Sequence, residues 1–189
     1  VTYLAIACNA LAAVLAAITV AIYIFGYTPL KRTSTANTAV GAIPGAIPPV
    51  IGWVAGGGSL TDAGAVVLFG ILFLWQMPHF LAIAWLCRAD YAAAGFPMLT
   101  VRDPQGTRTA RQAILYGAAL VPVSLLPAAL GVLGSVYLAG ALALSLAYLG
   151  FGFAFARNRS TPRARGLMLA SIAYLPVLLI LMLLDRVVH

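Results

Sequence analysis

Charged side chains are scarce in this sequence. Only 8% of its 189 residues are Asp, Glu, Lys or Arg, whereas 63% are hydrophobic, and the mean hydropathy is +1.02. A typical soluble domain has about 25% charged residues and roughly half apolar residues. The composition therefore excludes an ordinary soluble domain and indicates an integral membrane protein.

Cysteine and acidic residues are also few, with two and four in the whole chain. Cys8 and Cys87 lie in different apolar runs and form no C-x-x-C pair, so we expect neither a disulfide framework nor a cysteine metal site. No basic leader or A-x-A-like site opens the chain, so we expect no cleavable signal peptide. No soluble basic domain is present either, which argues against nucleic acid as a partner.

Long apolar runs, by contrast, are abundant. A helix of about 20 apolar residues crosses the bilayer core of about 30 Å, and we predict six such spans, at 1–26, 38–57, 62–87, 112–132, 135–156 and 167–187. These runs are too long and too uniformly apolar for barrel strands, and backbone groups in lipid must bond within their own segment. The sequence predicts an all-α, polytopic helical bundle that forms a single domain over residues 1–189. Gly41 and Gly45, four residues apart, predict close helix packing.

The cations predict an orientation. With six spans the loops alternate sides, and ten of the eleven Lys and Arg residues fall on one side: Lys31, Arg32, Arg88, Arg102, Arg108, Arg111, Arg157, Arg159, Arg163 and Arg165. The positive-inside rule places that side in the cytoplasm. We therefore expect a multi-pass protein of the cell (inner) membrane, with most of these cations contacting lipid headgroups. Segments 27–37 and 88–111 are longer and more varied than the opposite loops, so a site facing the cytoplasm is predicted there.

The segment YTPLKRTSTAN, residues 27–37, places three donors together without a nearby acid. Tyr27 and Lys31 share a helix face if the first helix continues through them, and Arg32 lies beside that face. A phenol, an ammonium and a guanidinium suit a phosphate or diphosphate group. The alternative is a pair of interfacial cations that reach toward the headgroups beside a belt tyrosine.

Asp90 follows the third predicted span, on the same side as Lys31. Diphosphate chemistry needs a hard cation such as Mg2+, for which carboxylate oxygens are the usual protein ligands. Asp90 is therefore a candidate metal ligand, and its alternative is a hydrogen bond at a helix end or in a loop. Asp103, in the sequence RDPQG, has the context of a turn residue.

His79 lies in the run WQMPHF, on the order of 12 Å inside the end of its helix. A titratable side chain at that depth is a functional candidate, because leaving it unpaired in hydrocarbon is costly. Pro78 frees a carbonyl one turn back and favours a polar pocket there. The alternative is a neutral imidazole bonded to a neighbouring helix. Trp75, Phe80 and Trp85 could line a flat cavity or simply pack.

Four ordered segments, YTPLKRTSTAN, GAIPGAIPPVIGWVA, FLWQMPHF and DYAAAGFPML, resemble the protoheme IX farnesyltransferases, also called haem O synthases, of the UbiA superfamily of intramembrane prenyltransferases. The resemblance covers nearly the whole chain. It implies transfer of a farnesyl group from farnesyl diphosphate to a vinyl group of haem B, with Mg2+ assisting the loss of diphosphate. The vinyl group attacks the allylic carbocation and water completes the product, in a cavity that excludes bulk water.

The resemblance also implies roles for individual residues. Lys31 and Arg32 would act on the diphosphate and Asp90 would be catalytic as a ligand of Mg2+. His79 would face the haem as an axial ligand or a polar contact. The full set of substrate-binding residues is Tyr27, Asn37, His79, Trp75, Arg102 and Arg111. A haem-handling protein or a haem A synthase would be the partner that receives the product.

The chain departs from the superfamily pattern in its acidic motifs. No N-x-x-x-D-x-x-x-D motif precedes YTPLKR, and Asp90 is followed four residues later by Ala94 rather than by a second aspartate. A nine-helix family fold would leave six helices here, corresponding to its last six, and the chain starts at Val1 rather than at Met. We therefore expect an N-terminal part to be missing. We also expect the fragment alone to be inactive, because one aspartate cannot hold the metal cluster.

Three other functions remain open at this point. A prenyltransferase of the same superfamily could use an aromatic or quinone precursor as its acceptor. A transporter or binding protein for an anionic lipid or porphyrin could use the same basic pocket without catalysis, although the inverted repeats typical of transporters are not evident. A purely structural membrane subunit is the third.

Overall fold

A computed structural model of the chain describes the backbone of residues 1–188 and the side chains of residues 1–185. Within these residues the secondary structure is entirely helical, and six helical segments are long and apolar enough to cross a membrane. They are Ala10–Thr33, Asn37–Ala55, Ala63–Leu86, Thr107–Ala129, Ser135–Arg157 and Thr161–Asp185. The predicted class and the six spans are confirmed.

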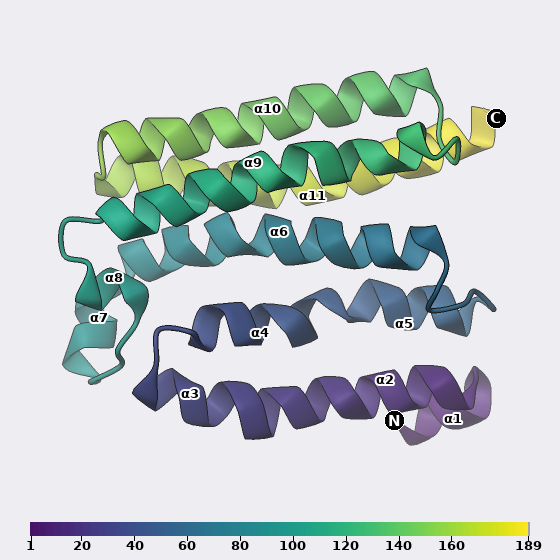
Figure 1. Ribbon diagram of the computed structural model, residues 1–189, viewed down its shortest axis with the longest axis horizontal. Helices are drawn as coiled ribbons and strands as arrows, with labels where there is room; N and C mark the ends of the chain where they lie inside the picture. Colours follow the sequence, from purple (N-terminus) through teal and green to yellow (C-terminus); the bar gives the residue numbers. More distant parts are fainter. Residues whose placement is uncertain (189) are drawn as a thin grey trace.

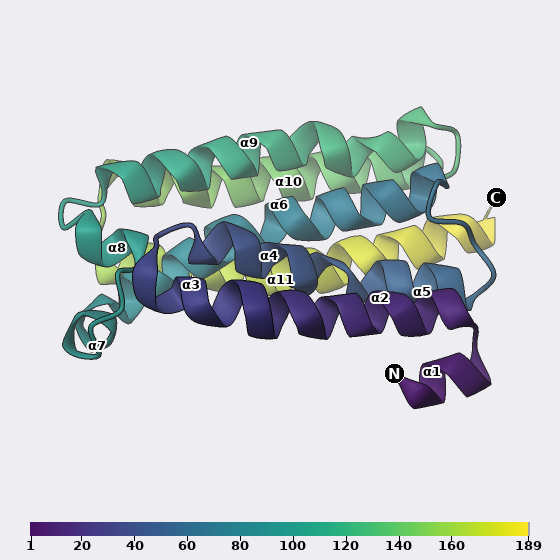
Figure 2. The same ribbon diagram turned by 60° about the horizontal axis from the view of Figure 1, so that its bottom comes forward.

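The first apolar run differs from the predicted span at both ends. A short helix, α1 (Thr2–Ala7), is followed by a break at Asn9, whose Oδ1 accepts a hydrogen bond from Ala12 N at 2.8 Å and so caps α2 (Ala10–Ala21). Asn9 Nδ2 also donates to Val54 O at 2.8 Å. Asparagine favours a helix N-cap over a helix interior, so the span starts after it rather than at Val1. Figure 2 shows α1 turned away from the bundle.

This first span continues beyond its predicted end. A π-helical turn, η1 (Ile22–Tyr27), leads directly into α3 (Thr28–Thr33), whose second residue is Pro29. Thr28 Oγ1 donates to Tyr23 O at 2.9 Å and supports the widened turn. Such π-turns inserted in helices occur frequently at functional sites.

Proline shapes the second span. It consists of α4 (Asn37–Ala46) and α5 (Pro48–Ala55), which join at Ile47 before two consecutive prolines. A proline lacks the backbone N–H that would continue the hydrogen-bond ladder, so the helix changes course there. Ala42 and Ala46 are fully buried on α4, where small side chains permit close approach of a neighbouring helix.

The remaining spans form one tightly packed group: α6 (Ala63–Leu86), α9 (Thr107–Ala129), α10 (Ser135–Arg157) and α11 (Thr161–Val188). Their shared core includes the fully buried Phe155, Tyr137 and Leu178. Helices α9 and α11 start earlier than predicted because arginines occupy their first turns, where long side chains can reach the membrane surface. Asp185 of α11 accepts hydrogen bonds from the backbone N–H groups of Gly134 and Tyr137, capping α10 from the neighbouring helix.

The spans lie side by side in layers. In Figure 1, α2–α3 forms one edge, α4–α5 lies next to it, α6 follows, and the group of α9, α10 and α11 completes the bundle. Two short helices, α7 (Arg88–Ala93) and α8 (Leu99–Arg102), project together at one end. They connect α6 to α9, and the hydroxyl of Thr100 donates to Ala84 O at 2.9 Å to hold α8 against α6.

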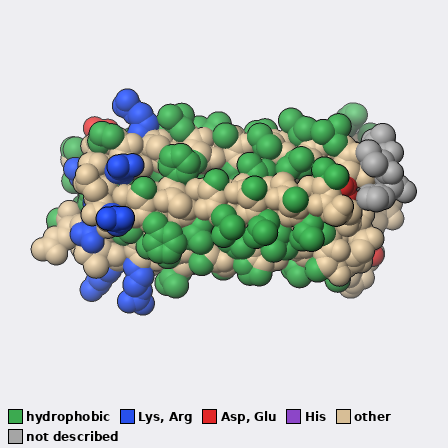
Figure 3. Space-filling view, turned by 90° about the horizontal axis from the view of Figure 1, so that it is seen from above, with side chains coloured by type: hydrophobic (Ala, Val, Ile, Leu, Met, Phe, Trp, Pro, Cys, Tyr) green, Lys and Arg blue, Asp and Glu red, His purple; other side chains and the backbone are tan. Residues whose placement is uncertain are grey.

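Cations mark the same end of the bundle. The ten Lys and Arg residues assigned to one side by sequence lie near the ends of helices, or in the case of Arg159 in the loop between α10 and α11, at the end of the bundle beside α7 and α8, which we call the cation end. Figure 3 shows Lys and Arg side chains gathered at one end of the visible face and hydrophobic side chains over the rest. This distribution is the one expected of a bundle with its long axis across a membrane.

Candidate functional site

Tyr27 and Lys31 lie on one continuous helical segment, which was the condition for placing them on one helix face. The π-turn ends at Tyr27, and α3 carries Lys31 and Arg32 in its last turn. The Tyr27 ring lies 5.0 Å from the Tyr23 ring, centroid to centroid. Against its other side stands Gly41 of α4, where a Cβ would come within 2.7 Å of Tyr27 Cδ2. The absence of a side chain at Gly41 therefore leaves room for the Tyr27 ring to lie against α4.

A cavity of about 270 Å³ opens beside Tyr27 at the cation end. It lies between η1, α4 and the last turns of α6, and Tyr91 of α7 and Met98 before α8 complete its lining. Its lining is mixed in polarity: Tyr23, Tyr27, Asn37, Thr38, Gly41, Phe80, Ile83, Ala84, Tyr91 and Met98. Phenol, hydroxyl and amide groups thus share the cavity with an apolar wall contributed by α6.

Lys31 connects the two segments that the sequence singled out. Its Nζ lies 4.9 Å from the centroid of the Phe96 ring, a cation–π contact between α3 and the loop that follows α7. Phe96 in turn packs edge-on against Tyr91, with centroids 6.4 Å apart. Segments 27–37 and 88–98 therefore meet at one place, although about sixty residues separate them in the sequence.

Tyr91 is a cavity residue that sequence reasoning missed. It follows Asp90 directly in DYAAAGFPML, so its place in that motif was the available signal. Burial raises the pKa of the Tyr91 phenol above its ordinary value, and the neighbouring Cys87 and Asp90 side chains raise this pKa further. The phenol therefore stays protonated at neutral pH and can donate a hydrogen bond to an anion.

Asn37 is almost fully buried and its amide is used within the protein. Its Nδ2 donates to Ser34 O at 2.8 Å and to Met98 Sδ at 3.3 Å, while its Oδ1 accepts from Thr38 Oγ1 at 3.0 Å. These bonds fix the turn between α3 and α4 and attach it to the loop before α8. Asn37 thus lines the cavity and shapes its wall, and its role in binding the substrate stays a prediction.

The arginines predicted for the site lie outside the cavity. Arg32, Arg102 and Arg111 are exposed, on the last turn of α3, on α8 and near the start of α9. None of the three is among the residues that line the cavity, and Lys31 is not either, although its contact with Phe96 places it beside the cavity. They add positive charge to the cation end, which attracts anions without fixing their position.

Asp90 is exposed on α7, one residue before the cavity-lining Tyr91. Among the residues that the structure describes, no group of three or more His, Cys, Asp or Glu side chains is assembled to hold a metal ion. Asp103, expected in a turn, accepts hydrogen bonds from the backbone N and the hydroxyl of Thr109 at 2.8 and 3.0 Å, which anchors the start of α9. Asp90 is therefore the carboxylate at this end that remains available for a ligand.

His79 and Trp75 form a second cluster, deeper in the bundle. The two rings stack with centroids 5.3 Å apart and planes at 15°. Both are bonded to Ser171 of α11: Trp75 Nε1 donates to its backbone O at 2.8 Å, and His79 Nδ1 lies 2.6 Å from its Oγ. The imidazole bonded to a neighbouring helix, one of the two alternatives for His79, is thus present, and its second ring nitrogen is still available for a ligand.

The run WQMPHF contains one further polar residue that sequence reasoning passed over. Gln76 is buried, and its Nε2 donates to Ala42 O of α4 at 2.6 Å. A Cβ at Gly45 would lie 2.3 Å from Gln76 Oε1. The Gly41 and Gly45 pair therefore does mediate close packing, as predicted, against the side chains of Tyr27 and Gln76.

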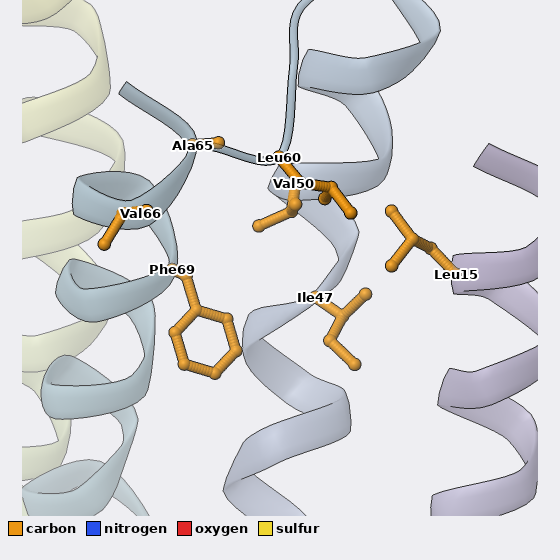
Figure 4. Close-up of a pocket in the computed structure, with 7 residues that line it drawn as sticks. All are labelled: Leu15, Ile47, Val50, Leu60, Ala65, Val66 and Phe69. Atoms are coloured by element: carbon orange, nitrogen blue, oxygen red, sulfur yellow. The ribbon is translucent and has the colours of Figure 1, made fainter. Parts of the chain in front are cut away.

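Two further cavities are apolar. One, of about 260 Å³, lies between α2, α5 and α6 and is lined by Leu15, Ile47, Val50, Leu60, Ala65, Val66 and Phe69 (Figure 4). Another, of about 430 Å³, lies toward the end of the bundle opposite the cations, and Trp53, Val67, Leu133 and Met182 are among its lining residues. Of the three cavities, the one beside Tyr27 combines a polar lining with a neighbouring cation.

The sequence agrees with a known family over nearly its whole length. The model of the UbiA prenyltransferase family matches residues 1–180. The chain belongs to the UbiA prenyltransferase family. This confirms the superfamily predicted from YTPLKRTSTAN, FLWQMPHF and DYAAAGFPML.

This UbiA chain is similar to several proteins named as protoheme IX farnesyltransferases. It is 54% identical over 178 residues to the protoheme IX farnesyltransferase of Solibacter usitatus, covering 94% of this chain and 61% of the relative. It is 45% identical over 193 residues to that of Koribacter versatilis, covering 98% of this chain and 62% of the relative. The mitochondrial protoheme IX farnesyltransferase of Arabidopsis thaliana is 41% identical over 179 residues, which are 95% of this chain and 41% of the relative.

The UbiA chain is shorter than these relatives and spans about three fifths of the length of the bacterial ones. No solved structure gives a significant match to it. The family assignment thus rests on sequence, and the geometry of the site rests on the fold described above.

Proposed function

We propose that this chain supplies the diphosphate-facing and haem-facing parts of a protoheme IX farnesyltransferase. The observation that supports this most is the contact between Lys31 and Phe96, which closes segment 27–37 onto segment 88–98 around the polar cavity. Two of the motifs on which the family resemblance rests therefore meet where an anionic head group would bind. By the positive-inside rule, the cation end lies in the cytoplasm.

Residues that line the cavity or lie beside it perform the first part of the reaction. The ammonium of Lys31 and the phenols of Tyr27 and Tyr91 hold the diphosphate of farnesyl diphosphate, with Arg32 at the exposed rim and Asn37 fixing the wall. As the C–O bond breaks, diphosphate leaves with the electron pair, and fixed donors at this position stabilise the developing negative charge. Arg102 and Arg111 contribute to the positive field that attracts the substrate.

The apolar wall of the cavity, contributed by α6, keeps water away during the second part of the reaction. The allylic carbocation reacts with a vinyl group of haem B, and the new C–C bond leaves a cation on the porphyrin substituent. Water adds to that cation and a proton is released, which completes haem O. His79 and Trp75 contact the haem, deeper in the bundle than the diphosphate. A haem-handling protein or a haem A synthase then receives the product.

Mg2+ would neutralise the diphosphate as it leaves. Such an ion is usually held by one or two carboxylates together with substrate phosphates and several waters. Asp90 fits as one carboxylate ligand, because it is exposed beside the cavity. The described residues offer no complete metal site, and none of the steps assigned above to the residues of this chain depends on the ion.

A chimera tests the proposal. The 178 matching residues of the Solibacter usitatus enzyme are replaced by those of this chain, and the purified protein is assayed with haem B, farnesyl diphosphate and Mg2+. We expect the chimera to make farnesylated haem, detected by mass spectrometry, and the 189-residue chain alone to be inactive. Prenylation of 4-hydroxybenzoate without farnesylated haem would assign the aromatic-acceptor function instead, and ligand binding without turnover would assign a binding protein.

Substitutions in the same chimera test the site. Lys31→Ala and Asp90→Ala should each lower kcat by on the order of 100-fold, the loss typical of a removed charge-stabilising group. His79→Ala should mainly raise the KM for haem. Arg163→Ala removes an exposed cation at the same end, on the first turn of α11, and should change neither value. Unchanged rates in all three site variants would remove the assignment.

A further inference from the structure

Ser171 is the point at which α11 meets the His79 cluster. It is fully buried, and it bonds two residues of α6 at once. Its backbone carbonyl accepts the indole N–H of Trp75, and its hydroxyl pairs with Nδ1 of His79. The Trp75 ring in turn covers one face of the imidazole. The position and rotation of the imidazole are therefore fixed from α11.

The hydroxyl of Ser171 has a second partner that decides where the proton lies. Its Oγ lies 2.5 Å from the backbone oxygen of Met168, one turn earlier in α11. A carbonyl oxygen can only accept, and a hydroxyl has one proton to donate, so that proton points to Met168 O. The hydroxyl oxygen must then accept at its other contact, 2.6 Å from His79 Nδ1. Nδ1 is consequently the ring nitrogen that carries a proton and donates it to Ser171 Oγ.

In a neutral imidazole with its proton on Nδ1, the lone pair is on the other ring nitrogen, Nε2. Within the residues whose side chains are described, no hydrogen bond is made to Nε2 of His79. The adjacent Phe80 ring, with its centroid 5.6 Å from the imidazole, lines the cation-end cavity. A neutral imidazole whose Nδ1–H is held by a buried acceptor is the usual arrangement of a histidine that binds a metal through Nε2.

We propose that Ser171 is a positioning residue, which holds His79 as the Nδ1–H tautomer and leaves Nε2 to bind the iron of haem. The inference deepens the proposed function and rests on it for the identity of the ligand. Ser171 does not touch the reacting atoms, and it acts through the orientation and basicity of the imidazole.

The tautomer itself can be measured without any substrate. The chain contains two histidines, His79 and the C-terminal His189, so His189→Ala leaves a single imidazole. With ¹⁵N-labelled histidine in the detergent-solubilised 189-residue chain, we expect a proton on Nδ1 and a bare Nε2. Ser171→Ala should give a mixture of tautomers. A proton on Nε2 in the His189→Ala chain with Ser171 intact would overturn the proposal, whatever the activity proves to be.

Haem affinity gives the second measurement. Titration of the chain with ferric haem B should give the spectrum of a histidine ligand, absent in His79→Ala. Ser171→Ala should weaken haem binding by about 10- to 100-fold, the usual cost of removing such a partner of a metal-binding histidine. Ser171→Thr keeps a hydroxyl and should restore much of the affinity. Protoporphyrin IX, which lacks iron, should bind Ser171→Ala as it binds the unsubstituted chain.

Ser145→Ala is the matched control, because it removes another buried serine hydroxyl, one that bonds Tyr174 at 3.1 Å on α11. It should leave haem affinity unchanged. If His79→Ala weakens haem binding and Ser171→Ala does not, the positioning role fails while the proposed function stands. If haem binds all of the variants equally, His79 is not a haem ligand and the haem-facing part of the proposed function fails with it.

Discussion

The two halves of the bundle are packed differently. Large side chains such as Phe155, Tyr174 and Leu178 fill the core shared by α6, α9, α10 and α11, whereas the buried apolar residues of α2 and α4 are mainly alanines. Two of the three cavities lie where the layer of α2–α5 meets α6, and the third, of about 430 Å³, lies at the end opposite the cations, where Trp53 of α5 meets α6, α9 and α11. In lipid, apolar burial itself gives little driving force, so packing and hydrogen bonds hold helices together. The well-filled half therefore maintains the shape of the bundle. The boundary between α2–α5 and α6, which we call the seam, contains cavities that a ligand could occupy.

Emptying the core of the filled half should have the largest effect on stability. Phe155 is fully buried and packs edge-on against Trp85, with ring centroids 5.7 Å apart. Phe155→Ala should cost about 3 kcal/mol, the lower end of the range for soluble proteins, because lipid removes most of the transfer contribution. Unfolding in mixed micelles measures this. Phe153→Ala, at an exposed position on the same helix, should be nearly neutral, and equal losses would contradict the contrast between the halves.

Filling the seam should disturb the site more than the fold. At Gly41→Ala the new Cβ would lie 2.7 Å from Tyr27 Cδ2, so the phenol must move. We expect a loss of about 1–3 kcal/mol in stability, together with weaker binding of farnesyl diphosphate, measured by titration calorimetry. At Gly52 of α5, nothing lies within 4 Å of an added Cβ. Gly52→Ala should therefore be harmless, and normal diphosphate binding by Gly41→Ala would show that Tyr27 is not a ligand.

The smallest effect on stability should come from substitution of Asp62, at the end of the bundle opposite the cations. Hydrogen bonds from Trp53 Nε1 at 2.9 Å and from Ser59 N at 2.7 Å lower the pKa of Asp62 below its ordinary value. A lowered folded-state pKa means that Asp62 stabilises the protein at neutral pH, and that this contribution is lost as the pH falls through the folded-state pKa.

Thermal melts of the chain and of Asp62→Asn should therefore differ slightly at neutral pH and converge in acid, with no change at the cation-end cavity. A difference between the two melting temperatures that is independent of pH would show that the carboxylate charge is not what matters.

The pattern of apolar residues was sufficient to predict the helices, but not all of their boundaries. Length and hydropathy gave six spans because the bilayer imposes them on any chain of this composition. Asn9 and the arginines of α9 and α11 shifted the ends, since a capping side chain and long cations at the interface count for more than average hydropathy. The π-turn before Tyr27 left no signal in the apolar pattern, because it depends on local hydrogen bonding.

The candidate site, like the helices, was predicted from the sequence only in part. The residue types in YTPLKRTSTAN and DYAAAGFPML predicted an anion site, since unpaired donors are rare in so apolar a chain. Sequence spacing gave no means to predict that Lys31 lies over Phe96, that Tyr91 enters the cavity, or that Arg102 and Arg111 stay outside it. Asn37, predicted as a substrate ligand, makes bonds that hold two loops together.

The sequence by itself determined that this chain is a helical membrane bundle of the UbiA family with its cations at one end, because composition, periodicity and motifs are properties of the chain alone. Only the tertiary structure decided which groups meet: the cavity beside Tyr27, and the bond between His79 and Ser171 across 92 residues of sequence. The physical reason is that such contacts depend on how helices pack against one another. The small residues that permit this packing, chiefly glycine and alanine, do not specify which residues they will contact.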